Sequence, residues 1–147
     1  FRIARLPVIN QVMRWVSPRN LFEGGLKTAI YDDKIVTPDM VDMYWRLNRR
    51  EGTRAATLKR FNTPWDTYNA DNMSKIEMPT LILWGDKDTL IPPDSGEAAR
   101  DAIKGSQFVL YKNVGHIPME EVPDQSAADV KAFLKGEPVP SLAATAP

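Results

Sequence analysis

The sequence predicts an α/β protein in which an all-helical segment precedes a strand-helix-strand-helix unit of a parallel sheet. Apolar residues recur every three or four positions through residues 1–73, which indicates amphipathic helices. Two short apolar runs, Thr80–Trp84 and Gln107–Tyr111, then break that spacing and are typical of strands buried on both faces. Each run is followed by a segment with helical spacing, and a helix between two such strands implies a right-handed parallel crossover.

Composition narrows the class of protein. Of the 147 residues, 43% are hydrophobic and 26% are charged, which is typical of a globular protein. The absence of cysteine excludes disulfides, thiolate zinc sites and a cysteine nucleophile, and a single histidine argues against a transition-metal site. A formal net charge of zero gives no electrostatic case for a nucleic-acid partner. No apolar run approaches the roughly 18 residues of a membrane span, so no membrane partner is expected.

Residues 1–73 are expected to form four short helices, which would make a helical lid or a small helical domain. Ser17-Pro18 and Thr37-Pro38 each place a capping hydroxyl before a proline at the first helical position, which predicts two helix starts. An apolar stripe within residues 6–16 predicts a helix before them, and residues 53–61 predict a short fourth helix.

Residues 74–136 are expected to supply the sheet. In order, the expected elements are a strand at Thr80–Trp84, a helix at Asp94–Lys104, a strand at Gln107–Tyr111 and a helix at Pro123–Lys135. Fully apolar parallel strands need neighbours at their edges and helices on both faces, so we expect more sheet than this sequence contains. The remaining tail, residues 137–147, holds prolines and small residues and is expected to be flexible.

Two residues with catalytic chemistry follow the two predicted strands. Asp88 comes shortly after the first strand, and His116, the only histidine, follows the second strand 28 positions later. The carboxyl ends of parallel strands meet at one edge of a sheet, where active sites of open α/β sheets lie. An acid there can accept the imidazole Nδ1–H and stabilise the imidazolium. Each residue alone would be an ordinary loop residue, but together they predict the acid and base of a nucleophile-His-acid triad.

The nucleophile of that triad is missing from the sequence. A strand-to-helix elbow of the form G-x-S-x-G occurs nowhere. The nearest segment, Asp94-Ser95-Gly96, has Pro93 and Glu97 where the flanking glycines should stand. The chain is therefore expected to be part of an enzyme.

Residues 78–135 resemble the C-terminal end of the α/β-hydrolase superfamily. Members carry a proline before an apolar strand, then W-G-x-x-D with a later proline, and then G-H with a downstream E-x-P. The matching positions here are Pro79, Trp84, Gly85, Asp88, Pro92, Gly115, His116, Glu121 and Pro123. The resemblance implies that Asp88, rather than Asp86, is the triad acid, because it falls three residues after the glycine.

The same resemblance implies what surrounds this part of the fold. Residues 1–73 are similar to the helical cap that many members insert upstream of the acid. The family's first strands, oxyanion segment and nucleophile elbow should precede Phe1. We therefore expect a partner, the N-terminal part of the same protein, that carries the nucleophile.

Four residues are candidates for substrate binding. Leu90 and Ile117 flank the two catalytic candidates and could line an acyl or alcohol pocket, or equally close the sheet edge. Tyr44 and Trp45 in the lid could contact substrate, although aromatics at helical spacing commonly serve packing. Glu120 and Glu121 are expected to face solvent or to cap the last helix near its positive N-terminal end.

We expect a hydrolase that acts on a small apolar substrate, without a cofactor. The leading expectation is hydrolysis of a carboxylic ester through a Ser-His-Asp triad whose serine lies outside this chain. One alternative has an aspartate nucleophile, as in an epoxide hydrolase or a haloalkane dehalogenase, and another is a carbon-carbon bond hydrolase. A catalytically idle ligand receptor is the alternative outside enzymes. The sequence starts at Phe1, so a signal peptide cannot be judged; the expected location is cytoplasmic.

Overall fold

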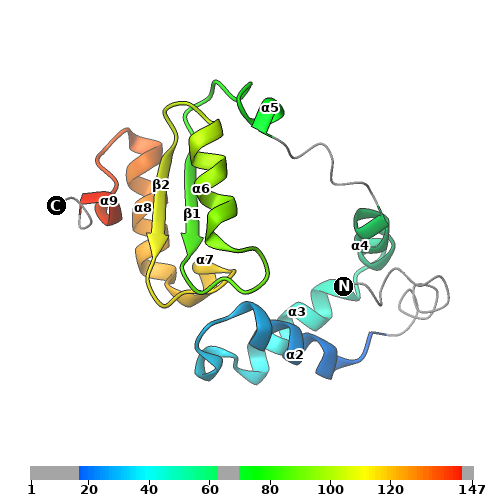
Figure 1. Cartoon of the computed structure of the whole chain (residues 1–147). Coiled ribbons are helices and arrows are strands. Elements are labelled where there is room, and N and C mark those ends of the chain that lie inside the picture. The colour runs from blue at the N-terminus through cyan, green and yellow to red at the C-terminus, as the bar shows by residue number, and fades with distance from the viewer. Residues whose placement is uncertain (1–16, 63–69, 144–147) are drawn as a thin grey trace. The chain divides into compact units, whose positions relative to one another are not determined.

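The structure is a computed structural model that describes residues 17–62 and 70–143. The helix expected within residues 6–16 lies outside these residues. The described elements, in chain order, are α2 (Arg19–Ala29), η2 (Asp33–Ile35), α3 (Pro38–Asn48), α4 (Thr53–Asn62), α5 (Ala70–Met73), β1 (Leu81–Gly85), α6 (Pro93–Ala102), β2 (Gln107–Tyr111), α7 (Pro118–Glu121), α8 (Pro123–Lys135) and α9 (Pro140–Ala143) (Figure 1). No helix in these two stretches is long and apolar enough to cross a bilayer.

The chain divides into two compact units. Of the described residues, the first comprises 17–26 and 36–62, and the second comprises 27–35 and 70–143. This division differs from the expected lid boundary in two segments, because residues 27–35 and 70–73 belong to the sheet-bearing unit.

Helices α2 and α3 of the first unit are joined by side-chain contacts. Thr37 caps α3 as expected, since its hydroxyl oxygen accepts the backbone N–H of Met40 at 3.2 Å. The indole Nε1 of Trp45 donates to the backbone oxygen of Ser17 at 2.8 Å, and the guanidinium of Arg49 lies 4.6 Å from the centre of the Trp45 ring. Arg19 pairs with Asp42 between the two helices.

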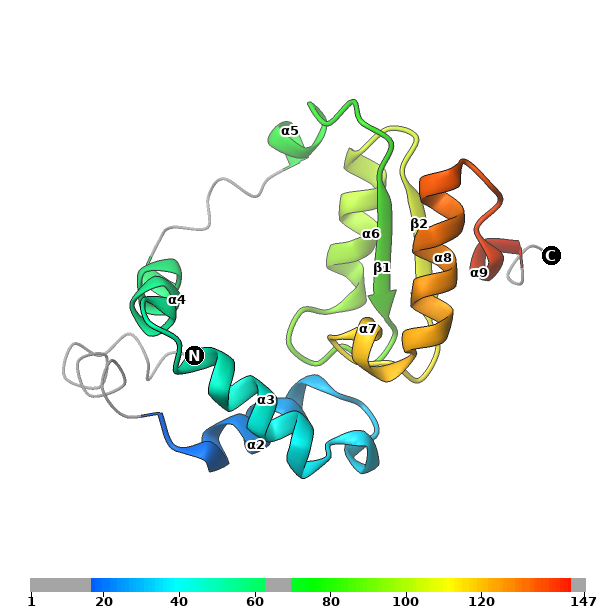
Figure 2. The same ribbon diagram turned by 180° about the vertical axis from the view of Figure 1, so that it is seen from behind.

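The second unit holds the predicted strand-helix-strand-helix. β1 and β2 pair in parallel, in register from Leu81↔Gln107 to Gly85↔Tyr111. Helices α6 and α8 flank the two strands (Figures 1 and 2), and the core is centred on β2, with Val109 and Tyr111 buried. In the described part of the chain the sheet has two strands, and β1 has a neighbour on one edge alone.

The flexible tail expected after residue 136 is wrong for residues 137–143. Helix α9 forms there, and Val139 before it is only 2% exposed and belongs to the core. The fully buried carboxylate of Asp129 in α8 accepts the backbone N–H of Ser141 at 2.9 Å and its hydroxyl at 2.6 Å. The same carboxylate accepts the hydroxyl of Tyr111 at 2.7 Å. This segment is ordered because it satisfies a buried charge and fills the core.

Candidate active site

The structure brings Asp88 and His116 together. Asp88 lies in the loop after β1 and His116 in the loop after β2, so both leave the carboxyl edge of adjacent parallel strands. Oδ2 of Asp88 lies 2.8 Å from Nδ1 of His116. This is the hydrogen bond that an acid must make to orient a catalytic imidazole.

The carboxylate of Asp88 is held in place by its own loop. Its side chain is 3% exposed, and Oδ1 accepts the backbone N–H groups of Leu90 and Ile91, each at 2.9 Å. One oxygen therefore satisfies the loop while the other faces the imidazole. The carboxylate is therefore held with one oxygen directed at the ring nitrogen.

Asp86 does not contact the imidazole and instead braces the histidine loop. Its Oδ1 accepts the backbone N–H of Asn113 at 2.6 Å and that of Val114 at 3.4 Å. Asn113 has a φ of 58°, in the left-handed region, so the chain turns sharply just before it reaches His116. The two aspartates thus have separate tasks.

The second ring nitrogen of His116, Nε2, takes no part in the contact with Asp88. With Nδ1–H bonded to Asp88, the neutral ring carries a lone pair on Nε2. Among the described residues Nε2 has no hydrogen-bond partner, and 34% of the side chain is exposed. The backbone N–H of His116 donates to the carbonyl of Ala29 at 2.7 Å, which anchors the loop to the end of α2. A ring held in this way has the geometry expected of a general base.

Two glycines allow the loops to meet backbone to backbone. A Cβ on Gly85 would lie 2.1 Å from the carbonyl oxygen of Gly115, and one on Gly115 would lie 2.4 Å from the carbonyl oxygen of Ala29. Neither position has room for a side chain. The W-G and G-H motifs thus mark the places where the two loops and the segment 27–35 touch.

Glu121 lies at this junction, which the sequence did not reveal. Its Oε1 accepts the backbone N–H of Gly115 at 2.7 Å, and its Oε2 accepts the backbone N–H of Tyr31 at 2.9 Å. The expectation that Glu121 faces solvent or caps the last helix is wrong, because both oxygens bind backbone groups of other segments. The one feature of the sequence that singled out Glu121 is its place in the E-x-P motif.

The substrate-binding candidates fall in different places. Leu90 and Ile117 are both half-buried beside the Asp88–His116 pair: Leu90 donates its N–H to Asp88, and the carbonyl of Ile117 accepts the N–H of Glu120 as α7 begins. Tyr44 and Trp45 are half-buried on α3 of the first unit. Substrate contact by these four residues stays a prediction.

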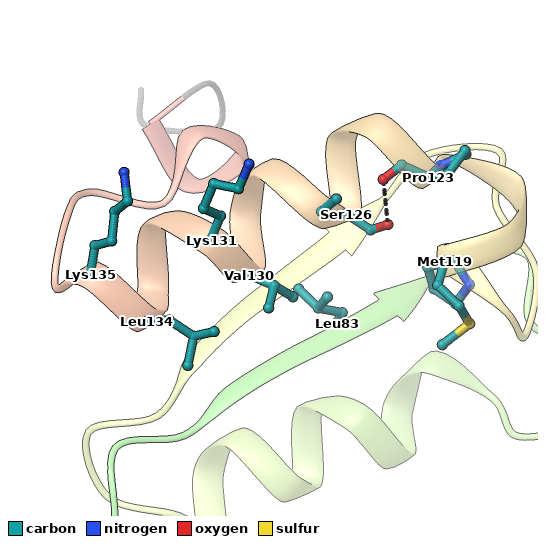
Figure 3. A pocket seen from close by; sticks show the side chains of 10 residues that line it. Leu83, Met119, Pro123, Ser126, Val130, Lys131, Leu134 and Lys135 are labelled. Atoms are coloured by element: carbon teal, nitrogen blue, oxygen red, sulfur yellow. Dashed lines mark hydrogen bonds between the residues drawn. The ribbon is translucent and has the colours of Figure 1, made fainter.

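The structure has an apolar groove of about 730 Å³ whose lining includes neither Asp88 nor His116 (Figure 3). It is lined by β1, α7 and α8, with Leu83 of β1 pointing towards Val130 of α8. Met119 and Leu134 line it as well, and they are 62% and 77% exposed. Neither Leu90 nor Ile117 lines this groove.

In the stretches that the structure describes, no group of three His, Asp or Glu side chains is arranged to hold a metal ion.

A parallel sheet with an acid and a histidine at its carboxyl edge is the arrangement of an α/β hydrolase. The family described as "alpha/beta hydrolase fold" matches residues 5–123, most of the chain. The chain belongs to the α/β-hydrolase family.

Individual relatives are similar to parts of this chain. Lipase 3 of Moraxella sp. (strain TA144) is 41% identical over 64 residues, which cover 44% of this chain and 20% of that lipase. A solved esterase from Thermogutta terrifontis has a TM-score of 0.69 and 25% identity, covering 86% of this chain and 47% of its own. A meta-cleavage product hydrolase from Pseudomonas fluorescens IP01 has a TM-score of 0.71 and 19% identity, covering 86% and 49%. The chain therefore spans about half the length of these solved relatives.

Proposed function

We propose that this chain supplies the histidine and the acid of a Ser-His-Asp triad in an enzyme that hydrolyses a carboxylic ester of a small apolar molecule. The observation that carries the proposal is the 2.8 Å contact between Asp88 and His116, with the other oxygen of Asp88 held by two backbone N–H groups. The names of the relatives favour ester substrates, since the Moraxella relative is a lipase and the Thermogutta relative an esterase.

The proposed mechanism uses the free nitrogen of His116. Nε2 removes the proton of a serine hydroxyl as the serine attacks the ester carbonyl, and Asp88 stabilises the resulting imidazolium. Nε2 then gives that proton to the leaving alcohol. In the second half-reaction Nε2 takes a proton from a water molecule that attacks the acyl carbonyl, and it gives that proton to the serine oxygen as the acyl–serine bond breaks, which releases the acid and restores the serine. The oxyanion donors would come from the part of the protein that bears the serine.

We further propose that the nucleophile-bearing part of the same protein covers β1 and the apolar groove. The free edge of β1 presents unpaired backbone groups, which a further strand would satisfy. The exposed side chains of Met119 and Leu134 beside that strand would be buried by the same part. The shorter span of this chain relative to its solved relatives is consistent with such a part. We call this chain together with that part the complete enzyme.

Labelling with a fluorophosphonate tests the proposed reaction, because this reagent forms a stable adduct with an activated serine. The complete enzyme should be labelled and should hydrolyse short p-nitrophenyl esters. His116→Ala should lose both properties, while Asp124→Asn, a charge removal at an exposed position of α8, should keep them. Hydrolysis of an epoxide or haloalkane without labelling would instead indicate an aspartate nucleophile, and cleavage of a carbon-carbon bond alone would reject the ester substrate.

A further inference from the structure

We propose that Glu121 is a positioning residue for His116, holding the histidine loop against the segment that follows α2. This inference rests on the proposed function, because it assigns Glu121 a task in the turnover of that enzyme. The residue itself does not touch the reacting atoms.

The two oxygens of Glu121 bind two parts of the chain that are distant in sequence. Oε1 accepts the N–H of Gly115, the residue immediately before His116, at 2.7 Å. Oε2 accepts the N–H of Tyr31, 90 positions away, at 2.9 Å. One carboxylate thus joins the histidine loop to the segment 29–31.

That segment also contacts the histidine and the acid loop directly. The carbonyl of Ala29 accepts the N–H of His116 at 2.7 Å, and the carbonyl of Thr28 accepts the hydroxyl of Thr89, the neighbour of Asp88, at 2.9 Å. Residues 28–31 therefore bridge the two loops that carry the triad residues. Glu121 completes this bridge on the histidine side.

A carboxylate suits this position better than any neutral side chain of the same size. Both donors are backbone N–H groups, so both partner atoms must be acceptors. Hydrogen bonds to an ionised acceptor are also stronger than neutral ones. A glutamine would offer one acceptor and one donor, and its NH₂ group would oppose one of the two N–H groups. Gly115 has little room to shift towards these partners, since even an added Cβ would lie 2.4 Å from the Ala29 carbonyl oxygen and 2.9 Å from Glu121 Oε1 and from the Tyr31 nitrogen.

The consequence concerns the place of the imidazole. The backbone that carries the ring has little freedom, because the N–H groups of Gly115 and His116 are both hydrogen-bonded. The contact with Asp88 fixes the orientation of the ring itself. Loss of the hydrogen bond between Glu121 and the Gly115 N–H should let Nε2 of His116 move away from the serine oxygen. A displacement of the order of 1 Å in a catalytic group can cost about 100-fold in rate.

The test measures rate per active site in the complete enzyme. Fluorophosphonate titration counts the active sites, and stopped-flow measurement of the p-nitrophenol burst gives the acylation rate constant. We expect Glu121→Gln to lower acylation and kcat per titrated site about 10- to 100-fold with little change in KM. Glu121→Ala should be lower still, whereas Glu121→Asp should recover part of the rate. Asp124→Asn is the matched control and should keep the wild-type rate.

Each other outcome of this experiment would overturn the positioning role of Glu121. If Glu121→Gln titrates fewer sites but each turns over at the wild-type rate, Glu121 serves stability alone and the inference is overturned. If neither Glu121→Gln nor Glu121→Asp gives any titratable site, a role in folding replaces the positioning role. A wild-type enzyme that takes no label and shows no burst overturns the proposed function, and the inference with it.

Discussion

One oxygen of Asp88 faces the imidazole of His116 while the other is bound by the backbone of its own loop. The carboxylate therefore cannot rotate to offer its second oxygen without losing the N–H groups of Leu90 and Ile91. The carboxylate is thus held in one orientation, which is the preorganisation that its proposed role as the triad acid requires.

Replacement of His116 by alanine should lower turnover by several orders of magnitude. It removes the general base, and no other imidazole exists in this chain. The ring is partly exposed, so the fold should persist. Ester hydrolysis and circular dichroism of the complete enzyme would check both halves of this expectation, and near-wild-type turnover would reject His116 as the base.

The two aspartates should respond differently to conversion into asparagine. Asp88→Asn removes the acceptor that fixes the ring tautomer and should lower kcat about 10³- to 10⁴-fold. Asp86→Asn keeps an amide oxygen for the N–H of Asn113, so the loss should stay below about tenfold. Steady-state kinetics on the two variants makes the comparison. Equal losses of kcat in the two variants would mean that contact with the His116 ring does not distinguish the role of Asp88 from that of Asp86.

Gly115→Ala should impair both stability and activity. Its Cβ would meet the backbone oxygen of Ala29 at 2.4 Å, so the histidine loop must shift. Gly25→Ala is a suitable control, because a Cβ there meets nothing within 4 Å and the position lies inside α2. The control should raise the free energy of unfolding by about 0.5–1 kcal/mol. Thermal denaturation with an activity assay would compare them, and a Gly115→Ala enzyme as active as wild type would contradict the close approach.

Tyr111 should make stability depend on alkaline pH. Burial, reinforced by its hydrogen bond to Asp129 and by that charge, raises the pKa of Tyr111 above its ordinary value. In the unfolded chain a tyrosine ionises near pH 10. Above that pH the unfolded state therefore binds fewer protons than the folded state, and the contribution of Tyr111 to stability is lost as pH rises towards the folded pKa.

The variant Tyr111→Phe isolates this contribution. It should cost about 1–3 kcal/mol at neutral pH, because Asp129 loses one of its three donors. It should also flatten the fall of stability above about pH 10. Chemical denaturation of the complete enzyme across pH 7–11 would measure both, with Tyr31→Phe, at a 51% exposed residue, as control. An unchanged alkaline slope in Tyr111→Phe would show that ionisation of Tyr111 is not linked to folding.

Residues 1–147 expressed alone should aggregate or fold loosely, and they should hydrolyse no ester. In the part of the chain that the structure describes, one edge of β1 has no strand beside it, and Met119 and Leu134 in the groove next to β1 are exposed. Light scattering, a thermal melt and the p-nitrophenyl assay would test this. A monomer with a cooperative melt and measurable hydrolysis would defeat the proposed nucleophile-bearing partner.

Periodicity and motif order predicted the sheet-bearing part of the fold well. The closing helix was expected at Pro123–Lys135 and lies there, and both strands and the helix between them fall within two residues of expectation. Asp88 and His116 were predictable because loops after parallel strands converge at one edge. These features depend on local sequence patterns and on one rule of topology.

The features that the sequence did not reveal depend on distant polar partners. Glu121 binds Tyr31 across 90 positions, and no local pattern points to that contact. The sequence also places the segment 27–35 in the lid. Its contacts with the sheet-bearing unit are made by its backbone groups, which leave no trace in the residue types. The order of residues 137–143 follows from the buried carboxylate of Asp129, whose partners become visible only after the chain has folded.

The cluster around Asp129 also constrains how this C-terminus can diverge among relatives. A substitution of Ser141 that removes its hydroxyl would leave a fully buried carboxylate short of one donor, so it should be tolerated mainly where Asp129 has already become apolar. The same dependence links Asp129 to Tyr111. In an alignment of homologues these three positions should therefore covary, and lineages that lose the polar residues should do so together or lose the last helix with them.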